Sequence, residues 1–497
     1  MSVFKPSRRW QPAFYPFKKE KPGRRLIARV ELAFKGPVFG CRMCGNCLLQ
    51  ETALICPMEC PKGLRNGPCG GVTPDNKCYI DETRKCIWYA IYERAFKTGR
   101  EKTLIEILPP LDWNKAGTET WGEVIRQIRK TGTGRFVKGF FLKDKVEKEK
   151  IWDSVFRTIR QPEWWAGDSD YHHPAYPEPV SVLEKKLRNG EFVVATEVVP
   201  PQGAASEKLR RGIEMVKPYV TAINFTDASS ATPKMSSLAC SKVAVDLQAE
   251  PVLQIAARDN TRTSLQSAAL GAGQFSIKNI LCITGDCATI GPSPTANLNM
   301  LDLDSVQMLW ILRKMRDEGI YLDGRKIRFP PRYFLGAATS PFAMKPEMQA
   351  LRDQKKVNAG AQFLQTNIIF EPERLDRWLE ELDKRNVLDK VFILAGAAPL
   401  KSYKTARYLH DKVPGVFLPE NVLRRMEKAG EREAEEGIQI VLEVIDSLKG
   451  KKGISGIHLM TMGWEEVVER IVKESGIYPP DPHFTSFSAS SEGGLIL

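Results

Sequence analysis

The sequence predicts a (β/α)8 barrel, the TIM-barrel fold, preceded by a small cysteine-rich, metal-binding α+β module. Two observations predict the barrel: from about residue 184, short apolar runs alternate with amphipathic helical patterns, and eight such runs occur along the chain. A third observation predicts the module, because eight of the eleven cysteines lie between Cys41 and Cys86. A doubly wound open sheet is the alternative to the barrel. No G-x-G-x-x-G motif follows the first apolar run, which argues against a dinucleotide-binding sheet.

The length of the chain predicts more than one domain. It has 497 residues, whereas one domain usually has about 100–200. We expect a basic N-terminal arm at residues 1–34 and the cysteine-rich module at 35–150. A linker rich in Trp, Pro, Asp and His follows at 151–185, and the barrel occupies 186–497.

Composition and charge exclude several classes of protein. With 42% hydrophobic and 27% charged residues, the chain reads as globular and not disordered. No run approaches the roughly 18 apolar residues of a membrane span, and no apolar segment follows the N-terminal basic residues, so we expect a cytoplasmic protein. The net charge is +13, of which nine basic residues against Glu20 place +8 in residues 1–30. No recognised nucleic-acid fold accompanies this charge, so nucleic acid is not the expected partner.

The spacing of the cysteines indicates metal-bound thiolates. The pattern Cys41-x-x-Cys44-x-x-Cys47 is followed by Cys56-x-x-x-Cys60-Pro, which together resemble a ferredoxin run split by an insertion. We predict an iron–sulfur cluster, of the [4Fe–4S] type, with zinc as the alternative. Eight ligands can also make two sites. The candidate metal ligands are Cys41, Cys44, Cys47, Cys56, Cys60, Cys69, Cys78 and Cys86.

The turns of this segment and its few apolar residues suggest that metal binding holds it together. Of the three remaining cysteines, Cys240 lies in a helical pattern, Cys282 in a strand and Cys287 after a strand end. Ahead of the barrel we also expect a strand at 104–108 and a helix at 121–130.

Helical patterns lie between most of the predicted barrel strands. The strands are expected at 192–199, 221–226, 251–256, 280–284, 332–338, 363–370, 391–395 and 456–460. The helices are expected at 206–216, 263–271, 303–318, 345–359, 373–384 and 431–448.

Polar side chains stand at the ends of these strands, where TIM barrels build their active sites. Glu197 ends the first strand, inside an apolar run that two prolines close. Burial would raise the pKa of such a carboxyl, which suits a general acid, although a structural pairing with Lys or Arg is the alternative. Polar groups also follow other strands, among them Thr226, Gln254, Thr284-Gly285-Asp286 and Gln365-Thr366-Asn367.

Several of these motifs resemble a known family. Glu197 with the following Val-Val-Pro-Pro, the strand at 279–286 that ends in Thr-Gly-Asp, and the segment 356–366 are similar to the methylenetetrahydrofolate reductase family over residues 190–480. The cysteines and the Leu-Pro-Pro-Leu-Asp-Trp run at 108–113 resemble the cysteine-rich companion module of acetogen-type members of this family, over residues 35–150.

The resemblance implies a flavin-bearing TIM barrel that reduces 5,10-methylenetetrahydrofolate to 5-methyltetrahydrofolate. FAD is the implied flavin, with FMN as the alternative. It implies that Glu197 protonates the folate so that the ring opens to an iminium ion, and that Asp286 lies near the flavin and tunes its reactivity. It further implies cofactor contacts from Thr226, Gln254, Thr284, Asp286 and Lys356, and substrate contacts from Glu197, Gln365 and Asn367.

The sequence departs from the family at four site positions. Gln254 stands where many members have a flavin-contacting His, Thr284 where Arg is common, Asn367 where members have a folate-binding Gln, and Ala338-Thr339 where a Tyr is frequent. The expected electron donor is a ferredoxin, a partner flavoprotein or NAD(P)H, and the expected assembly is a homo-oligomer. A folate-binding methyl-transfer or demethylation component without redox turnover is the alternative function, and a zinc-ribbon nucleic-acid binder represents a third class.

Overall fold

The structure, a computed structural model, describes residues 21–134, 137, 138, 147, 151, 169–293, 301–413 and 415–477. Most of the predicted basic arm, residues 1–20, and about half of the predicted linker, residues 152–168, therefore lie outside the described residues. None of the helices in the described ranges is long and apolar enough to cross a membrane.

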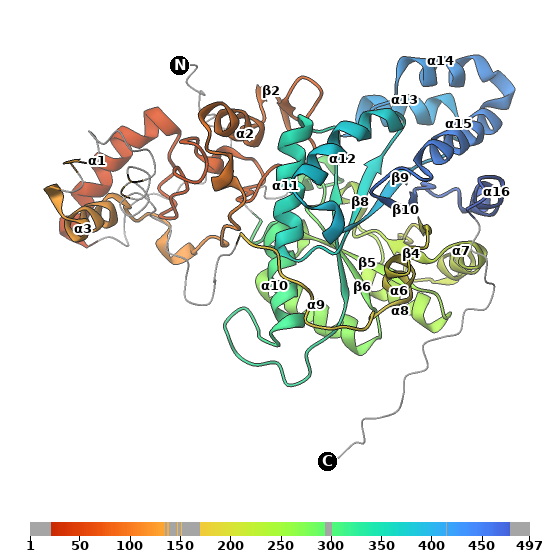
Figure 1. The fold of residues 1–497 in the computed structure, drawn as a ribbon, viewed down its shortest axis with the longest axis horizontal. Helices are drawn as coiled ribbons and strands as arrows, with labels where there is room; N and C mark the ends of the chain where they lie inside the picture. Colours follow the sequence, from red (N-terminus) through yellow and green to blue (C-terminus); the bar gives the residue numbers. More distant parts are fainter. Residues whose placement is uncertain are drawn as a thin grey trace, which may run out of the picture.

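Eight parallel strands close into a barrel, which confirms the predicted fold class (Figure 1). Each predicted apolar run coincides with one strand. A strand of this barrel is buried on both faces, so apolar residues follow one another along it without alternating polar ones. The barrel closes where the first strand pairs with the last, with Val193 opposite Gly456 and Thr196 opposite Leu459. The strands are β3 (Val193–Glu197), β4 (Ala222–Phe225), β5 (Pro251–Ala256), β6 (Asn279–Ile283), β7 (Phe334–Thr339), β8 (Phe363–Ile368), β9 (Phe392–Ala397) and β10 (Ile454–Leu459).

Helices surround the barrel, and each of the six predicted helices is present. Local capping fixes where they begin: Asp304 and Thr261 each form a capping box with the residue three positions later. The helices are α6 (Val182–Arg188), α7 (Glu207–Val216), α8 (Ser237–Asp246), α9 (Arg262–Gln274), α10 (Ser305–Asp317), α11 (Pro346–Ala359), α12 (Leu375–Lys384), α13 (Tyr403–Lys412), α14 (Glu420–Ala429), α15 (Glu433–Leu448) and α16 (Val468–Glu474).

The barrel interior is filled by apolar side chains from neighbouring strands. Phe334 and Phe363 stack there with ring centroids 4.9 Å apart. Gly336 makes room for this pair, because a Cβ at position 336 would lie 2.2 Å from the Phe363 ring. The interior is therefore a packed core, and only its C-terminal end remains open.

The cysteine-rich module is a small α+β unit. An antiparallel pair, β1 with β2, lies between its helices. The predicted strand at 104–108 is wrong: a 3₁₀ turn ends at Leu104 and no strand follows it within the described part of this module, because Ile107 and Leu108 pack against the barrel. The main elements are α1 (Pro22–Phe39), β1 (Lys77–Cys78), β2 (Asp81–Lys85), α2 (Ile87–Thr98) and α3 (Trp121–Thr131).

The module shares an apolar core with the barrel. Trp88 and Tyr92 of α2 are buried in one cluster with Met348 and Leu351 of α11. This contact lays the loop at residues 62–71 across the open end of the barrel. The sequence predicted that the module has little apolar core of its own. In the structure its apolar side chains pack in one cluster with side chains of the barrel helix α11.

Gly336→Ala should destabilise the protein by about 1–3 kcal/mol, since the added methyl group overpacks the barrel core against Phe363. Urea denaturation followed by circular dichroism measures the loss. Gly203→Ala is the matched control, because nothing lies within 4 Å of its Cβ. Equal stability of the two variants would mean that Phe363 moves aside without cost.

Candidate active site at the mouth of the barrel

A cavity of about 370 Å³ lies at the C-terminal ends of the barrel strands. Seven of the eight barrel residues predicted for the site line it: Glu197, Thr226, Gln254, Thr284, Asp286, Gln365 and Asn367. These side chains come from β3, β4, β5, β6 and β8, or from the residues just after them. The barrel topology therefore assembles a polar mouth from segments up to 170 residues apart, from 197 to 367.

Glu197 ends β3 and faces this cavity. Burial raises its pKa to about 7, while a hydrogen bond from the Met462 backbone and the charge of Lys234 act in the opposite direction. No ion pair to Glu197 is formed by the described residues, so the alternative of a structural pairing has no support there. A carboxyl group with this pKa can hold and release a proton near neutral pH.

His458 of β10 lines the same cavity and was missed by the sequence analysis. Its imidazole is buried, and neither ring nitrogen has a hydrogen-bond partner among the described residues. Burial lowers its pKa to about 4, so the ring is neutral at pH 7. The available signal was a single histidine within the apolar run at 454–459, close to the end of a strand.

Asp286 lies on the turn that follows β6. Gly285 has φ +78° and close neighbours, because a Cβ there would lie 3.1 Å from that of Ala256. The turn directs Asp286 into the cavity, where its Oδ2 accepts a hydrogen bond of 2.7 Å from the backbone N–H of Ser230. The carboxylate is thus held by the backbone of a neighbouring strand-end loop.

The amide side chains of the site are fixed across the barrel. Asn224 and Gln365 form a reciprocal pair, with Nδ2 to Oε1 at 2.6 Å and Nε2 to Oδ1 at 3.2 Å. Asn367 accepts a 2.9 Å hydrogen bond from the backbone of Ile368.

Thr226 differs, since its buried Oγ1 bonds to none of the residues that the structure describes. A buried hydroxyl without a partner is suited to a ligand in the cavity.

Lys356 does not line the cavity. Its Nζ donates a hydrogen bond to the carbonyl of Ala338 and lies 3.7 Å from Asp353. Burial lowers the pKa of this lysine to about 7. Its assignment to the cofactor phosphate stays a prediction from the resemblance.

The cysteine-rich module contributes part of the cavity wall. Lys62 donates a 2.8 Å hydrogen bond from Nζ to the carbonyl of Gly285, and Tyr79 accepts a 3.1 Å hydrogen bond from the backbone of Cys287. Cys69 and the two glycines after it line the cavity too. Sequence reasoning missed these residues, because nothing local indicates that residue 62 meets residue 285. The site therefore belongs to both parts of the chain.

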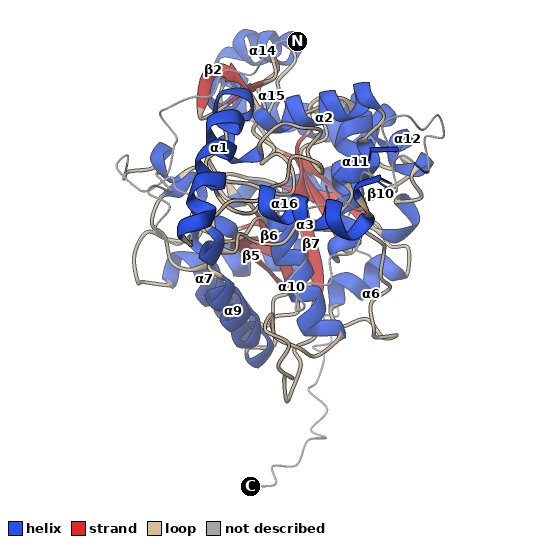
Figure 2. Ribbon diagram, turned by 90° about the vertical axis from the view of Figure 1, so that its left-hand side faces the viewer, coloured by secondary structure: helices blue, strands red, loops and turns tan. Residues whose placement is uncertain are grey.

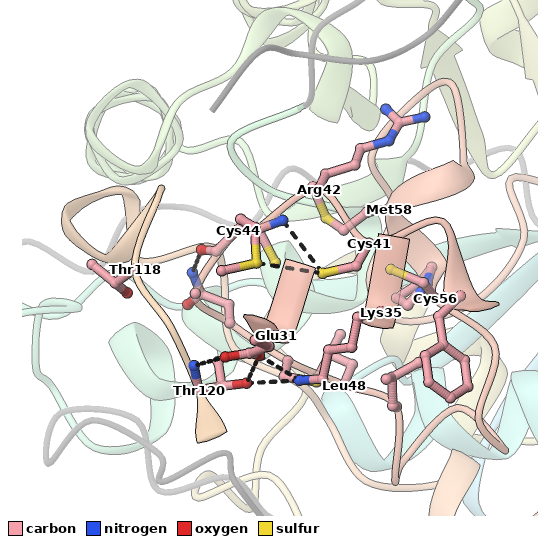
Figure 3. Close-up of a pocket in the computed structure, with 17 residues that line it drawn as sticks. Glu31, Lys35, Cys41, Arg42, Cys44, Leu48, Cys56, Met58, Thr118 and Thr120 are labelled. Carbon is pink, nitrogen blue, oxygen red and sulfur yellow. Dashed lines mark hydrogen bonds and ion pairs between the residues drawn. The ribbon is translucent and has the colours of Figure 1, made fainter. Parts of the chain in front are cut away.

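The eight clustered cysteines separate into two groups of four. Cys41, Cys44, Cys47 and Cys56 line an enclosed pocket together with Glu31 and Lys35 of α1 (Figure 3). Cys60, Cys69, Cys78 and Cys86 form the second group, and each is close enough to affect the pKa of another. The 3₁₀ turn at residues 57–59 joins the two groups. The second group reaches the barrel cavity through Cys69.

Burial raises the pKa of Cys41 and of Cys60 to about 12, so without metal these thiols keep their protons at pH 7. As placed, no three His, Cys, Asp or Glu side chains of the described residues form a ready site for one metal ion. Four thiols around one pocket nevertheless fit the donor set of a thiolate-bound centre. Metal binding would displace these protons and stabilise the loops.

Fold and site together define a TIM-barrel protein with an acidic, polar mouth capped by a cysteine-rich module. Residues 182–476 match the family described as methylenetetrahydrofolate reductase, and residues 24–114 match a module described as methylene-tetrahydrofolate reductase C terminal. The chain belongs to the methylenetetrahydrofolate reductase family.

One curated relative and two solved structures are similar to parts of the chain. Methylenetetrahydrofolate reductase 2 of Schizosaccharomyces pombe is 21% identical over 319 residues, which are 59% of this chain and 47% of that protein, so the chain spans about half the length of this relative. A Clostridium thermocellum protein described as binding two copies of 5-methyl-5,6,7,8-tetrahydrofolic acid has 15% identity and a TM-score of 0.45, covering 60% of this chain and all of its own. A riboflavin lyase has 11% identity and a TM-score of 0.36, covering 58% and 93%.

His458→Leu should leave the ligand-free protein as stable as the parent, or more stable, because it removes two buried nitrogens that have no partner among the described residues. Asn224→Leu is the contrasting control. It leaves the buried Gln365 side chain without its hydrogen-bond partner and should lower the free energy of unfolding by about 1–3 kcal/mol. Chemical denaturation compares the two variants. If His458→Leu lowered the free energy of unfolding by more than about 1 kcal/mol, the imidazole would have a structural role.

Proposed function

We propose that the chain is a flavin-dependent reductase that converts 5,10-methylenetetrahydrofolate into 5-methyltetrahydrofolate. The observation that carries the proposal is Glu197, a carboxyl group with a pKa of about 7 that faces the cavity of a barrel from this family. The reaction takes up two electrons and two protons. One proton goes to the amine nitrogen that leaves the methylene carbon, and a hydride, equal to two electrons and the other proton, goes to that carbon.

Glu197 supplies the proton at the first step. Protonation of the bridging amine breaks its bond to the methylene carbon and leaves an iminium ion on the other nitrogen. A neutral carboxyl is needed, because a carboxylate would only stabilise the cationic product. The neutral imidazole of His458 lines the same cavity and can hydrogen-bond to substrate or to a water molecule without adding positive charge near the iminium ion.

The residues of the mouth fit a flavin ring. The buried Thr226 hydroxyl, which no described residue satisfies, and the amide of Gln254 would hold its polar edge, with Thr284 and Asp286 on the adjoining strand end. A bound flavin would supply the hydride. Asp286, which accepts a hydrogen bond from the backbone of Ser230, would place a negative charge beside the ring. This charge would favour the oxidised flavin over the reduced one. FAD and FMN both meet these requirements.

The two cysteine groups provide a path for electrons to this site. We propose that they hold iron–sulfur centres of the [4Fe–4S] type, which would give the module a relay role. The second group borders the cavity at Cys69, and the 3₁₀ turn at residues 57–59 connects it to the first group, whose last member is Cys56. Zinc would stabilise the same loops but could not pass electrons.

Glu197→Gln should slow the reduction of methylenetetrahydrofolate by at least about 10²-fold, because the amide cannot donate an acidic proton. Reduction of the flavin by dithionite should stay near normal. In the parent the folate step should slow as the pH rises through about 7, where the acid form is lost, and the variant should lack this dependence. Stopped-flow absorbance separates the two half-reactions.

Glu191→Gln, on an exposed residue before β3, is the control and should behave as the parent. Equal losses in both half-reactions of Glu197→Gln would make Glu197 structural. No loss in either would mean that another group provides the proton.

Anaerobically purified protein should contain iron and acid-labile sulfide. Cys44→Ser and Cys86→Ser should each remove about half of the iron, because they belong to different cysteine groups. Cys240→Ala, on α8 away from both groups, should leave the iron content unchanged. Zinc without iron would overturn the relay, and loss of all iron from either variant would mean a single centre.

A further inference from the structure

Helix α1 carries a row of exposed apolar side chains. Leu26, Val30, Phe34 and Val38 are between 46% and 67% exposed. They are four residues apart, so they lie on one face of the helix. An apolar row of this length on a surface is typical of an interaction site. The helix lies at the end of the molecule remote from the barrel, which Figure 2 views directly.

Helix α3 lies beside α1 and widens this face. The ring of Trp121 is 5.8 Å from that of Phe34, and Ile125 is exposed one turn further on. The basic side chains of Arg129 and Lys130, at the end of α3, are exposed. We call Leu26, Val30, Phe34, Val38 and Ile125, with the exposed Arg29, Arg129 and Lys130, the α1–α3 surface.

The charge of this surface is positive. Arg29, Arg129 and Lys130 form no ion pair with any residue in the described ranges, and the half-buried acidic residue of α3, Glu123, is paired with Arg126. A partner that buries the apolar row would therefore meet uncompensated positive charge around it. Acidic proteins associate fastest with such a surface, at rates that fall with ionic strength.

Another face of α1, which carries Glu31 and Lys35, faces the first cysteine group. Lys35 Nζ lies 3.8 Å from Cys47 Sγ and donates a 2.6 Å hydrogen bond to Glu31, which accepts a 2.7 Å hydrogen bond from the backbone of Thr120 at the start of α3 (Figure 3). This buried network fixes both helices against the cysteine pocket. The α1–α3 surface and the cysteine pocket therefore share helix α1, which is about 10–12 Å across.

We propose that the α1–α3 surface is the docking site for a small acidic one-electron carrier protein, which reduces the chain through the first cysteine group. This inference rests on the proposed function, and it identifies the protein that would deliver electrons to the cysteine groups. Two reduced carriers each lose one electron, and the two electrons reduce one methylenetetrahydrofolate with two protons from solvent. A second copy of this chain or a membrane would also cover apolar side chains, but neither accounts for a cysteine group held by the same helix.

The test uses the intact protein with its cofactors and a purified acidic bacterial ferredoxin, reduced with dithionite, as the probe. Stopped-flow absorbance follows reduction of the iron–sulfur centres, and calorimetry follows binding. Val30→Asp with Phe34→Asp should lower the second-order rate at least 10-fold, as should Arg129→Glu with Lys130→Glu. The parent rate should fall steeply with salt, and the charge-reversed variant should lose most of this dependence.

Phe329→Asp is the matched control, since Phe329 is an exposed aromatic residue in a loop between α10 and β7, and it should leave the rate unchanged. Reduction by methyl viologen, which needs no docking, should be the same in all variants and reports that they fold. If the Val30→Asp and Phe34→Asp variant fails to fold, the Arg129→Glu and Lys130→Glu variant still tests the docking site.

Ferredoxin rates that neither variant changes would overturn the docking site. So would a parent dimer that Val30→Asp dissociates with no effect on the rate, or binding to anionic vesicles with no binding to ferredoxin. Failure of the proposed function has a different signature, because the parent would then not reduce methylenetetrahydrofolate even with methyl viologen.

Discussion

The contact between the loop at residues 62–71 and the C-terminal face of the barrel is the constraint on which the site depends. Asp304 illustrates it: one carboxylate oxygen caps α10, and the other accepts hydrogen bonds from the backbone of Arg65 and from the Asn66 side chain. The same loop sends Lys62 to Gly285. The contact thus ties the start of a barrel helix and the turn of Asp286 to the cysteine-rich module, and it brings Cys69 to the cavity.

Burial at the mouth of the barrel has chemical consequences. A carboxyl or imidazole that faces bulk water keeps its ordinary pKa, whereas the enclosed cavity raises that of Glu197 to about 7 and lowers that of His458 to about 4. One group becomes a proton donor and the other stays neutral. Both shifts have desolvation as their largest cause, so they depend on burial at the mouth of the barrel more than on any charged neighbour.

Most of the barrel could be predicted from the sequence, and the module's place on it could not. The strands are readable because each is buried on both faces, and strand-end residues such as Glu197 and Gln365 meet because the topology requires it. The contact of Lys62 with Gly285 joins residues 223 positions apart and leaves no local pattern. The division of the cysteines is similar, since spacing alone did not decide whether Cys56 or Cys60 joins the first three. Helices α13 and α14 were missed because they are additions beyond the strand–helix alternation.

The central claim is that module and barrel act as one redox unit. The most direct test is to reduce the anaerobic protein completely, remove the reductant, and mix it with excess methylenetetrahydrofolate. A flavin holds two electrons and two iron–sulfur centres hold one each, so the account predicts about two 5-methyltetrahydrofolate molecules per chain, with re-oxidation of the iron seen by Mössbauer spectroscopy. One molecule per chain, with the iron left reduced, would contradict it.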